Sequence, residues 1–153
     1  MPSPRSRPCS LPSTRARPET PGAGKWCAQE IVDHLILSHR PAIPQLEALI
    51  AGRRPEGGAI PAHLLSSNVM ERPWAGHVAD LQEVHRRFLG VLEQAGDGCD
   101  PSITVPIVMV VKVAAPGGFE AREWEEGLDF KAYAVALAAH TREHQAQIER
   151  GLG

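Results

Sequence analysis

Apolar residues recur at helical spacing in three stretches of this chain, and the last stretch, Phe130 to Arg150, is the most informative. His140 and His144 fall inside its apolar stripe and not on the opposite, polar face. Because residues four apart lie one above the other on a helix, both imidazoles are expected to point into whatever this helix packs against. The other members of the stripe are Phe130, Tyr133, Ala134, Leu137, Thr141 and Ile148.

A second helix is predicted from Trp26 to about His39, and it is apolar over more than one face, which is typical of a central helix. His34 lies on its apolar stripe. A break is expected at Arg40–Pro41, because proline disrupts the helix that precedes it. Helical spacing then resumes at Ile43 and stops at Gly52.

The third helical stretch, Trp74 to Ala95, has apolar residues at alternating steps of four and three, and His85 occupies one of these positions. The segment from Asp100 to Gly127 has no such period. Within it, Ile107 to Val113 fits a short strand, a buried extended segment or the start of another helix, and Ala114 to Gly118 indicates a loop. Asp129 is the expected N-cap of the last helix, which Gly151 ends. We predict an all-α fold, an antiparallel helical bundle.

Composition separates a polar tail from the folded part of the chain. Residues 1–24 hold six prolines and four arginines against the single acid Glu19, so we predict a disordered tail. A transit peptide and a nucleic-acid-binding arm are less favoured interpretations of this segment. Residues 25–152 form the predicted helical domain.

Net charge and cysteine content indicate which binding partners and which cellular compartment to expect. The net charge of -2 gives no reason to expect nucleic acid as a partner, and no apolar run is long enough to span a membrane. The three cysteines, Cys9, Cys27 and Cys99, are odd in number and lack close spacing, so neither a disulfide framework nor a cysteine-based zinc site is indicated. A cytoplasmic location follows from this pattern.

A divalent metal is one explanation for histidines on buried stripes. His-x-x-x-His on one helix face supplies two ligands, and the third must come from another segment, for which His34 is the best candidate and His85 a weaker one. Three protein ligands would leave a position open for water or substrate. The alternative is a set of core histidines bonded to carbonyls. Glu30 and Glu143 fit either acceptors for a ligand's free N–H or plain surface carboxylates.

The remaining histidines, His39, His63 and His77, lie beside prolines, in loops or on polar faces, and are expected to be solvated. Two protease signatures resemble the segment from His140 to His144. The zincin pattern fails because Thr141 stands where its glutamate belongs. The inverzincin spacing His-x-x-Glu-His matches literally, but a further ligand well downstream is required and only nine residues follow His144.

Two segments resemble DinB-like proteins, the DinB/YfiT superfamily of metalloenzymes. They are Trp26-Cys27-Ala28-Gln29-Glu30-Ile31-Val32-Asp33-His34-Leu35 and His140-Thr141-Arg142-Glu143-His144-Gln145-Ala146-Gln147-Ile148, within a resemblance that covers about Lys25 to Leu152. It implies a four-helix bundle in which His34, His140 and His144 hold one divalent ion, nickel or zinc. It also implies a small-molecule substrate, as in the family's thiol-dependent transferases.

The chain departs from that family at its front, where the tail stands in the place of the first bundle helix. Either the start includes mistranslated sequence or the protein lacks this helix, and in the second case the open apolar groove would favour a homodimer or aggregation. We therefore expect a metal-dependent transferase or hydrolase acting on a small molecule. The alternatives are a non-catalytic interaction or stress-response module with structural histidines, and a decayed paralogue that keeps the ligands without activity.

Overall fold

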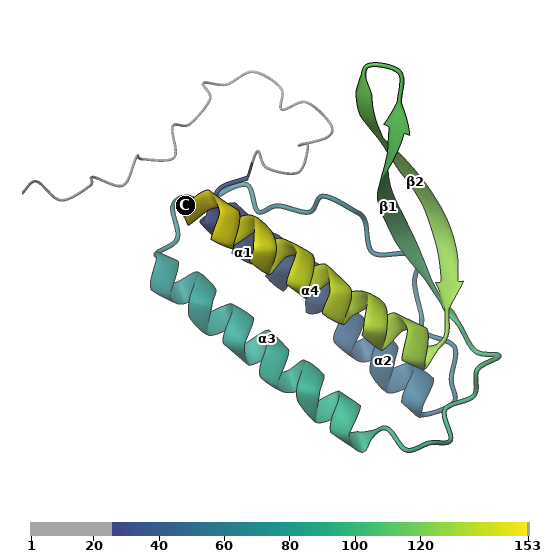
Figure 1. The fold of residues 1–153 in the computed structure, drawn as a ribbon. Helices are drawn as coiled ribbons and strands as arrows, with labels where there is room; N and C mark the ends of the chain where they lie inside the picture. Colours follow the sequence, from purple (N-terminus) through teal and green to yellow (C-terminus); the bar gives the residue numbers. More distant parts are fainter. Residues whose placement is uncertain (1–25, 153) are drawn as a thin grey trace, which may run out of the picture.

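The computed structural model describes residues 26–152, which fold as four helices and one antiparallel β-hairpin (Figure 1). The predicted tail of residues 1–24 lies outside the described residues. Within residues 26–152, no helix combines the length and the apolar character that a membrane span requires. The elements in chain order are α1 (Ala28–His39), α2 (Ala42–Ile50), α3 (Trp74–Gln94), β1 (Val105–Ala115), β2 (Gly118–Leu128) and α4 (Phe130–Leu152).

The prediction of an all-α antiparallel bundle of the DinB-like four-helix type is wrong. The part of the chain that connects α3 to α4 forms a two-stranded antiparallel sheet of β1 and β2. Each strand is 11 residues long, and the pairing runs from Val105↔Leu128 to Ala115↔Gly118. Gly117 has a φ of 93°, a left-handed conformation that glycine adopts without steric cost. The β-branched run is therefore a strand, and the expected loop is reduced to the two-residue turn between paired ends.

The helical predictions agree closely with the structure. α1 ends at His39 and α2 begins at Ala42, so the expected break lies where proline disrupts the helix. Asp129 caps α4, because its Oδ1 accepts the backbone N–H of Ala132 at 2.9 Å. α4 continues to Leu152, past the predicted end.

The helices enclose one hydrophobic core, which the base of β1 completes. α1 packs against α3 and α4, and α2 contacts the same two helices. Tyr133 of α4 donates from its hydroxyl to Oε1 of Gln45 in α2 at 2.6 Å, and both side chains are buried. This core holds α1 and α4 side by side (Figure 1). Its buried members are Val32, Ile36, Ala42, Ile43, Leu46, Leu49, Val84, Val91, Val105, Phe130, Tyr133 and Leu137.

The long connection between α2 and α3 has no regular structure but is fastened to α1 by polar side chains. Nε2 of Gln29 donates to the carbonyl oxygens of Val69 and Arg72, each at 2.8 Å. The carboxylate of Asp33, which is 1 % exposed, accepts the backbone N–H of Ser66 at 2.7 Å and its hydroxyl at 2.8 Å. These bonds satisfy backbone groups of a segment that lies outside the helices and strands.

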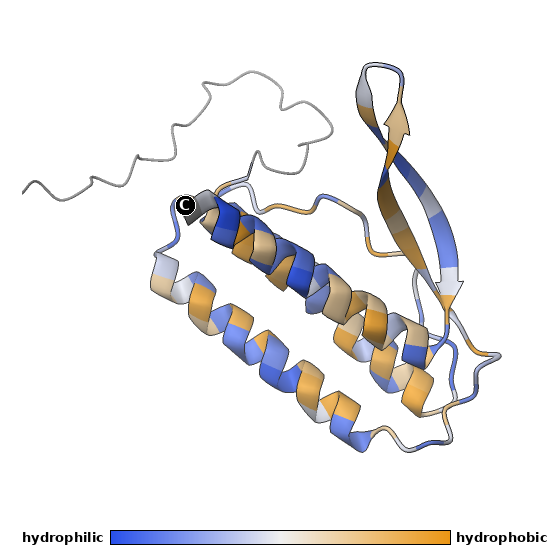
Figure 2. Cartoon of the chain, in the orientation of Figure 1, coloured by the Kyte–Doolittle hydropathy of each residue, from blue (hydrophilic) through white to orange (hydrophobic). Residues whose placement is uncertain are grey.

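The hairpin leans away from the helices at its turn, and its base lies beside α4 (Figure 1). The two strands contact each other far more than they contact any helix. β1 is mainly hydrophobic and β2 mainly hydrophilic (Figure 2). β1 forms one wall of a cavity beside the helices, whereas most residues of β2 are exposed to solvent.

Candidate metal centre

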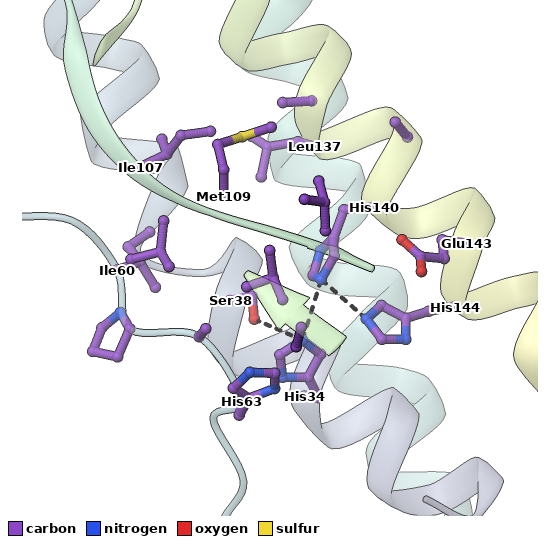
Figure 3. A pocket seen from close by; sticks show the side chains of 18 of the residues that line it. His34, Ser38, Ile60, His63, Ile107, Met109, Leu137, His140, Glu143 and His144 are labelled. Carbon is purple, nitrogen blue, oxygen red and sulfur yellow. Dashed lines mark hydrogen bonds between the residues drawn. The ribbon is translucent and has the colours of Figure 1, made fainter. Parts of the chain in front are cut away.

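Three histidines from two helices meet at one point between α1 and α4. His34 comes from the middle of α1, and His140 and His144 lie one turn apart on α4. Their ligand atoms all lie within 4.8 Å of one another, and the close-up view shows the rings turned toward one another (Figure 3). His34 and His144 are 4 % and 8 % exposed. The structure therefore brings together the three residues that the sequence proposed as ligands.

The atoms that converge are the Nε2 nitrogens. Nε2 of His140 is 3.2 Å from Nε2 of His34 and 3.0 Å from Nε2 of His144. A neutral imidazole carries a proton on one nitrogen and a lone pair on the other. The second contact of each ring therefore decides whether its Nε2 presents a lone pair to this point.

For His34 and His144 the second contact is an oxygen that can only accept. Nδ1 of His34 donates to the carbonyl oxygen of Leu64 at 2.9 Å, and Nδ1 of His144 donates to Oε1 of Gln147 at 2.8 Å. Since Nδ1 carries the proton in each ring, Nε2 keeps its lone pair. Such a contact also fixes the orientation of a metal-binding imidazole.

For His140 the second contact is another histidine. Nδ1 of His140 is 3.1 Å from Nε2 of His39. When His140 donates from Nδ1, His39 accepts through Nε2, and Nε2 of His140 is also left with a lone pair. His39 is 2 % exposed and is held between the rings of His85 and His140.

Burial keeps all three rings neutral. Desolvation lowers the pKa of His34 from 6.5 to about 4 and that of His140 to about 2. It also lowers the pKa of His144, an effect that the bond to Gln147 and the charge of Glu143 partly offset. Near neutral pH, His34 and His144 therefore present Nε2 lone pairs to Nε2 of His140, which either donates to one of them or, when its proton is on Nδ1, presents a third lone pair. A divalent cation bound by imidazole nitrogens satisfies all three.

A cavity of about 620 Å³ adjoins this centre. Its walls come from β1, from α4 and from the connection between α2 and α3, and Ile107, Met109, Leu137 and Ile60 line it (Figure 3). The three histidines lie at one end of the cavity with Ser38 and Glu143 beside them. A molecule in the cavity would thus reach the open side of a metal held by the three Nε2 atoms.

The expectation that His39, His63 and His77 are solvated is wrong for His39 and His77. His39 and His77 are 2 % and 0 % exposed, and His63 lines the cavity. His39 is buried because the chain turns directly after it and packs back on the core. Nε2 of His77 donates to the carbonyl oxygen of Val69 at 3.0 Å. A positive φ of 59° at His63 is the local feature that marks it as unusual.

The weaker candidates occupy other places. Oε2 of Glu30 accepts the backbone N–H of Cys27 at 3.0 Å, so this carboxylate caps α1. The ring centroid of His85 is 5.5 Å from that of His39, and its buried Nε2 has no hydrogen-bond partner among residues 26–152. Trp26, the first residue of the predicted helix, lines the cavity with its ring centroid 4.8 Å from that of His34.

No protein-family model, no curated protein and no solved structure matches this chain. The DinB-like family stays a prediction. The case for a metal centre consequently depends on the positions and contacts of the chain's own histidines.

Proposed function

We propose that this protein binds one divalent metal ion through the Nε2 atoms of His34, His140 and His144. The observation that carries the proposal is the convergence of three Nε2 atoms whose rings are each oriented by a contact at Nδ1. A donor set made of imidazoles suits nickel and zinc. Both ions are therefore included in the proposal.

The proposed role of the ion is to activate a nucleophile for a small-molecule transferase or hydrolase. Three protein ligands leave a coordination position for water or a thiol, whose pKa a divalent ion lowers toward neutrality. The adjoining cavity supports this role because it gives a substrate access to that position. The resemblance to DinB-like proteins adds a thiol as co-substrate, and the expected cytoplasmic location would keep such a thiol reduced.

The direct test is the metal content of the purified protein after equilibrium dialysis against nickel or zinc. We expect about one ion per chain for the natural sequence and almost none for a His140→Ala/His144→Ala variant, because one remaining imidazole cannot hold the ion. His85→Ala is the matched control, since it removes a half-buried histidine from another helix and should retain the metal. Equal metal content in the natural protein and the double variant would refute the proposal.

Thermal unfolding separates this function from that of an interaction module with structural histidines. An ion that binds only the folded state at 100 times its Kd adds about 2.7 kcal/mol of stability. A chelator should therefore lower the Tm of the metal-loaded protein and leave that of the double variant unchanged. An unchanged Tm for both proteins would favour the structural interpretation.

A further inference from the structure

The cavity beside the three histidines has mostly apolar walls. β1 contributes Ile107, Met109 and Val111, and α4 contributes Ala136 and Leu137. The labelled side chains Ile107, Met109 and Leu137 lie together at the end away from His34 and His144 (Figure 3). A cavity of about 620 Å³ is within the range that encloses a whole small molecule.

Few polar groups are available to recognise a highly charged ligand. Among the described residues that line the cavity, Lys112 and Glu143 are the ones with a charged side chain when the histidines are neutral. A phosphorylated substrate is normally held by several cations or by a cluster of backbone N–H groups. One lysine opposed by one glutamate does not provide such a site.

The donor set defines the headgroup that the metal would prefer. His34, His140 and His144 would all bind as neutral imidazoles, because a histidine coordinates a metal through the lone pair of a deprotonated ring nitrogen. The ion would therefore keep its full double positive charge, with no carboxylate among the three histidine ligands to offset it. An anionic group entering the open coordination position gains more from this charge than a neutral one does.

We propose that the substrate of this site is a small molecule with an apolar body and a single anionic headgroup, such as a carboxylate or a thiolate. The inference rests on the proposed metal binding and assigns its substrate class. The headgroup binds the metal between α1 and α4, and the body lies along β1 and α4. Apolar contact area then determines affinity within a series of ligands that share one headgroup.

The experiment uses the full chain loaded with Co²⁺, whose visible absorption reports directly on its ligands. Straight-chain monocarboxylates from acetate to decanoate are titrated in one arm, and alkanethiols of matching length in the other. We expect each ligand to change the spectrum and its Kd to fall about two- to fourfold per added methylene until the cavity is full. Carboxylates and thiols should share this dependence on chain length. The difference in Kd between a carboxylate and a thiol of equal length identifies the preferred headgroup.

Variants of the cavity wall test whether the apolar body occupies it. Ala136→Trp fills part of the cavity, so the Kd should level off at a shorter chain length. Val135→Trp, at a neighbouring position that is 67 % exposed, is the matched control and should leave the series unchanged. Met109→Gln keeps the side chain's length and should reduce the slope without large repacking, which covers the case in which Ala136→Trp does not fold.

The outcomes separate the two proposals. A Co²⁺ spectrum that ligands change, with a Kd independent of chain length, overturns the substrate class and leaves metal binding intact. A Kd that levels off at the same chain length in Ala136→Trp and Val135→Trp also overturns it, provided that both variants fold. Failure of the natural protein to bind Co²⁺, nickel or zinc overturns the proposed function and this inference with it.

Discussion

His39 lies directly behind the proposed metal centre, on the far side of His140 from the other two ligands. Its Nε2 is 3.1 Å from Nδ1 of His140, and its side chain is almost completely buried. When Nε2 of His39 accepts from Nδ1 of His140, Nε2 of His140 is left with the lone pair that a metal needs. Without this acceptor, the ring could turn or change tautomer, and the third ligand would be lost.

Replacing His39 tests this positioning role. His39→Phe keeps an aromatic ring beside Phe88 but removes the acceptor, and we expect about a 10- to 100-fold loss of metal affinity. His39→Gln retains an oxygen that can accept and should recover part of the loss. Nickel titrations that follow tryptophan fluorescence would measure both, because Trp26 contacts the centre. Equal affinities in the Phe and Gln variants would contradict the role.

At the scale of elements, the connection between α2 and α3 determines the position of His34. The carbonyl oxygen of Leu64 accepts from Nδ1 of His34, and Ser66, two residues later, is bound by the buried carboxylate of Asp33. Asp33 and His34 are adjacent on α1. Residues 64–66 of the connection are therefore bonded to the carboxylate of Asp33, and they in turn orient the ring of His34.

Asp33→Ala should both destabilise the fold and weaken metal binding. Loss of a buried carboxylate that accepts two hydrogen bonds leaves the Ser66 N–H and hydroxyl without partners, and we expect about 3 kcal/mol of lost unfolding free energy. Asp100→Ala is the matched control. Asp100 accepts the same pair of bonds from Ser102, at 2.8 and 2.7 Å, but it is exposed, so its loss should cost less than about 1 kcal/mol. Urea unfolding measures the lost unfolding free energy of both variants. Similar losses for Asp33→Ala and Asp100→Ala would contradict this role of Asp33.

The elements differ in how far the sequence predicts them. Helices were predictable because one face of each is buried and its period appears in the residues themselves. β2 was not, since every residue from Gly118 to Gly127 is exposed and the segment therefore shows no alternation. Its conformation comes from pairing with β1, a contact that no local pattern encodes. The two ligands on α4 and His34 on α1 were predictable from their stripes, whereas the contact of His39 with His140 depends on packing between α1 and α4.

At the scale of the whole molecule, the buried histidines make stability depend on pH. Desolvation lowers the pKa of His39 from 6.5 to about 3, that of His34 to about 4 and that of His140 to about 2. The same cause lowers the pKa of His85 and of His144. In the unfolded chain each ring titrates near 6.5. Below that pH the unfolded state binds more protons than the folded state, so acid favours unfolding.

We expect the metal-free protein to have nearly constant stability above about pH 7 and to lose it as the pH falls below about 6.5. Each fully buried ring contributes up to about 1.4 kcal/mol per pH unit, and the partly exposed rings contribute less. Urea midpoints between pH 8 and pH 5 measure the slope. His39→Gln removes one of these groups and should reduce it. A midpoint that does not change over this range would show that the rings titrate alike in both states.

Apolar side chains of the hairpin are exposed, which bears on the predicted homodimer. Phe119, Trp124 and Val110 of the hairpin are 78 %, 43 % and 40 % exposed, so apolar area is present outside the core. Such area is compatible with the homodimer, which stays a prediction. The groove expected in place of a missing first helix bears on residues that lie outside the described part of the chain.

The contacts at the three Nδ1 atoms have a consequence for how a metal would be exchanged. Each imidazole is oriented by Leu64, Gln147 or His39, and none of these contacts requires an ion. The entropic cost of arranging the ligands is therefore met when the chain folds. The folded protein should then act as a template that accepts cobalt, nickel or zinc in turn, so that one preparation can yield a series of derivatives that differ in the ion alone.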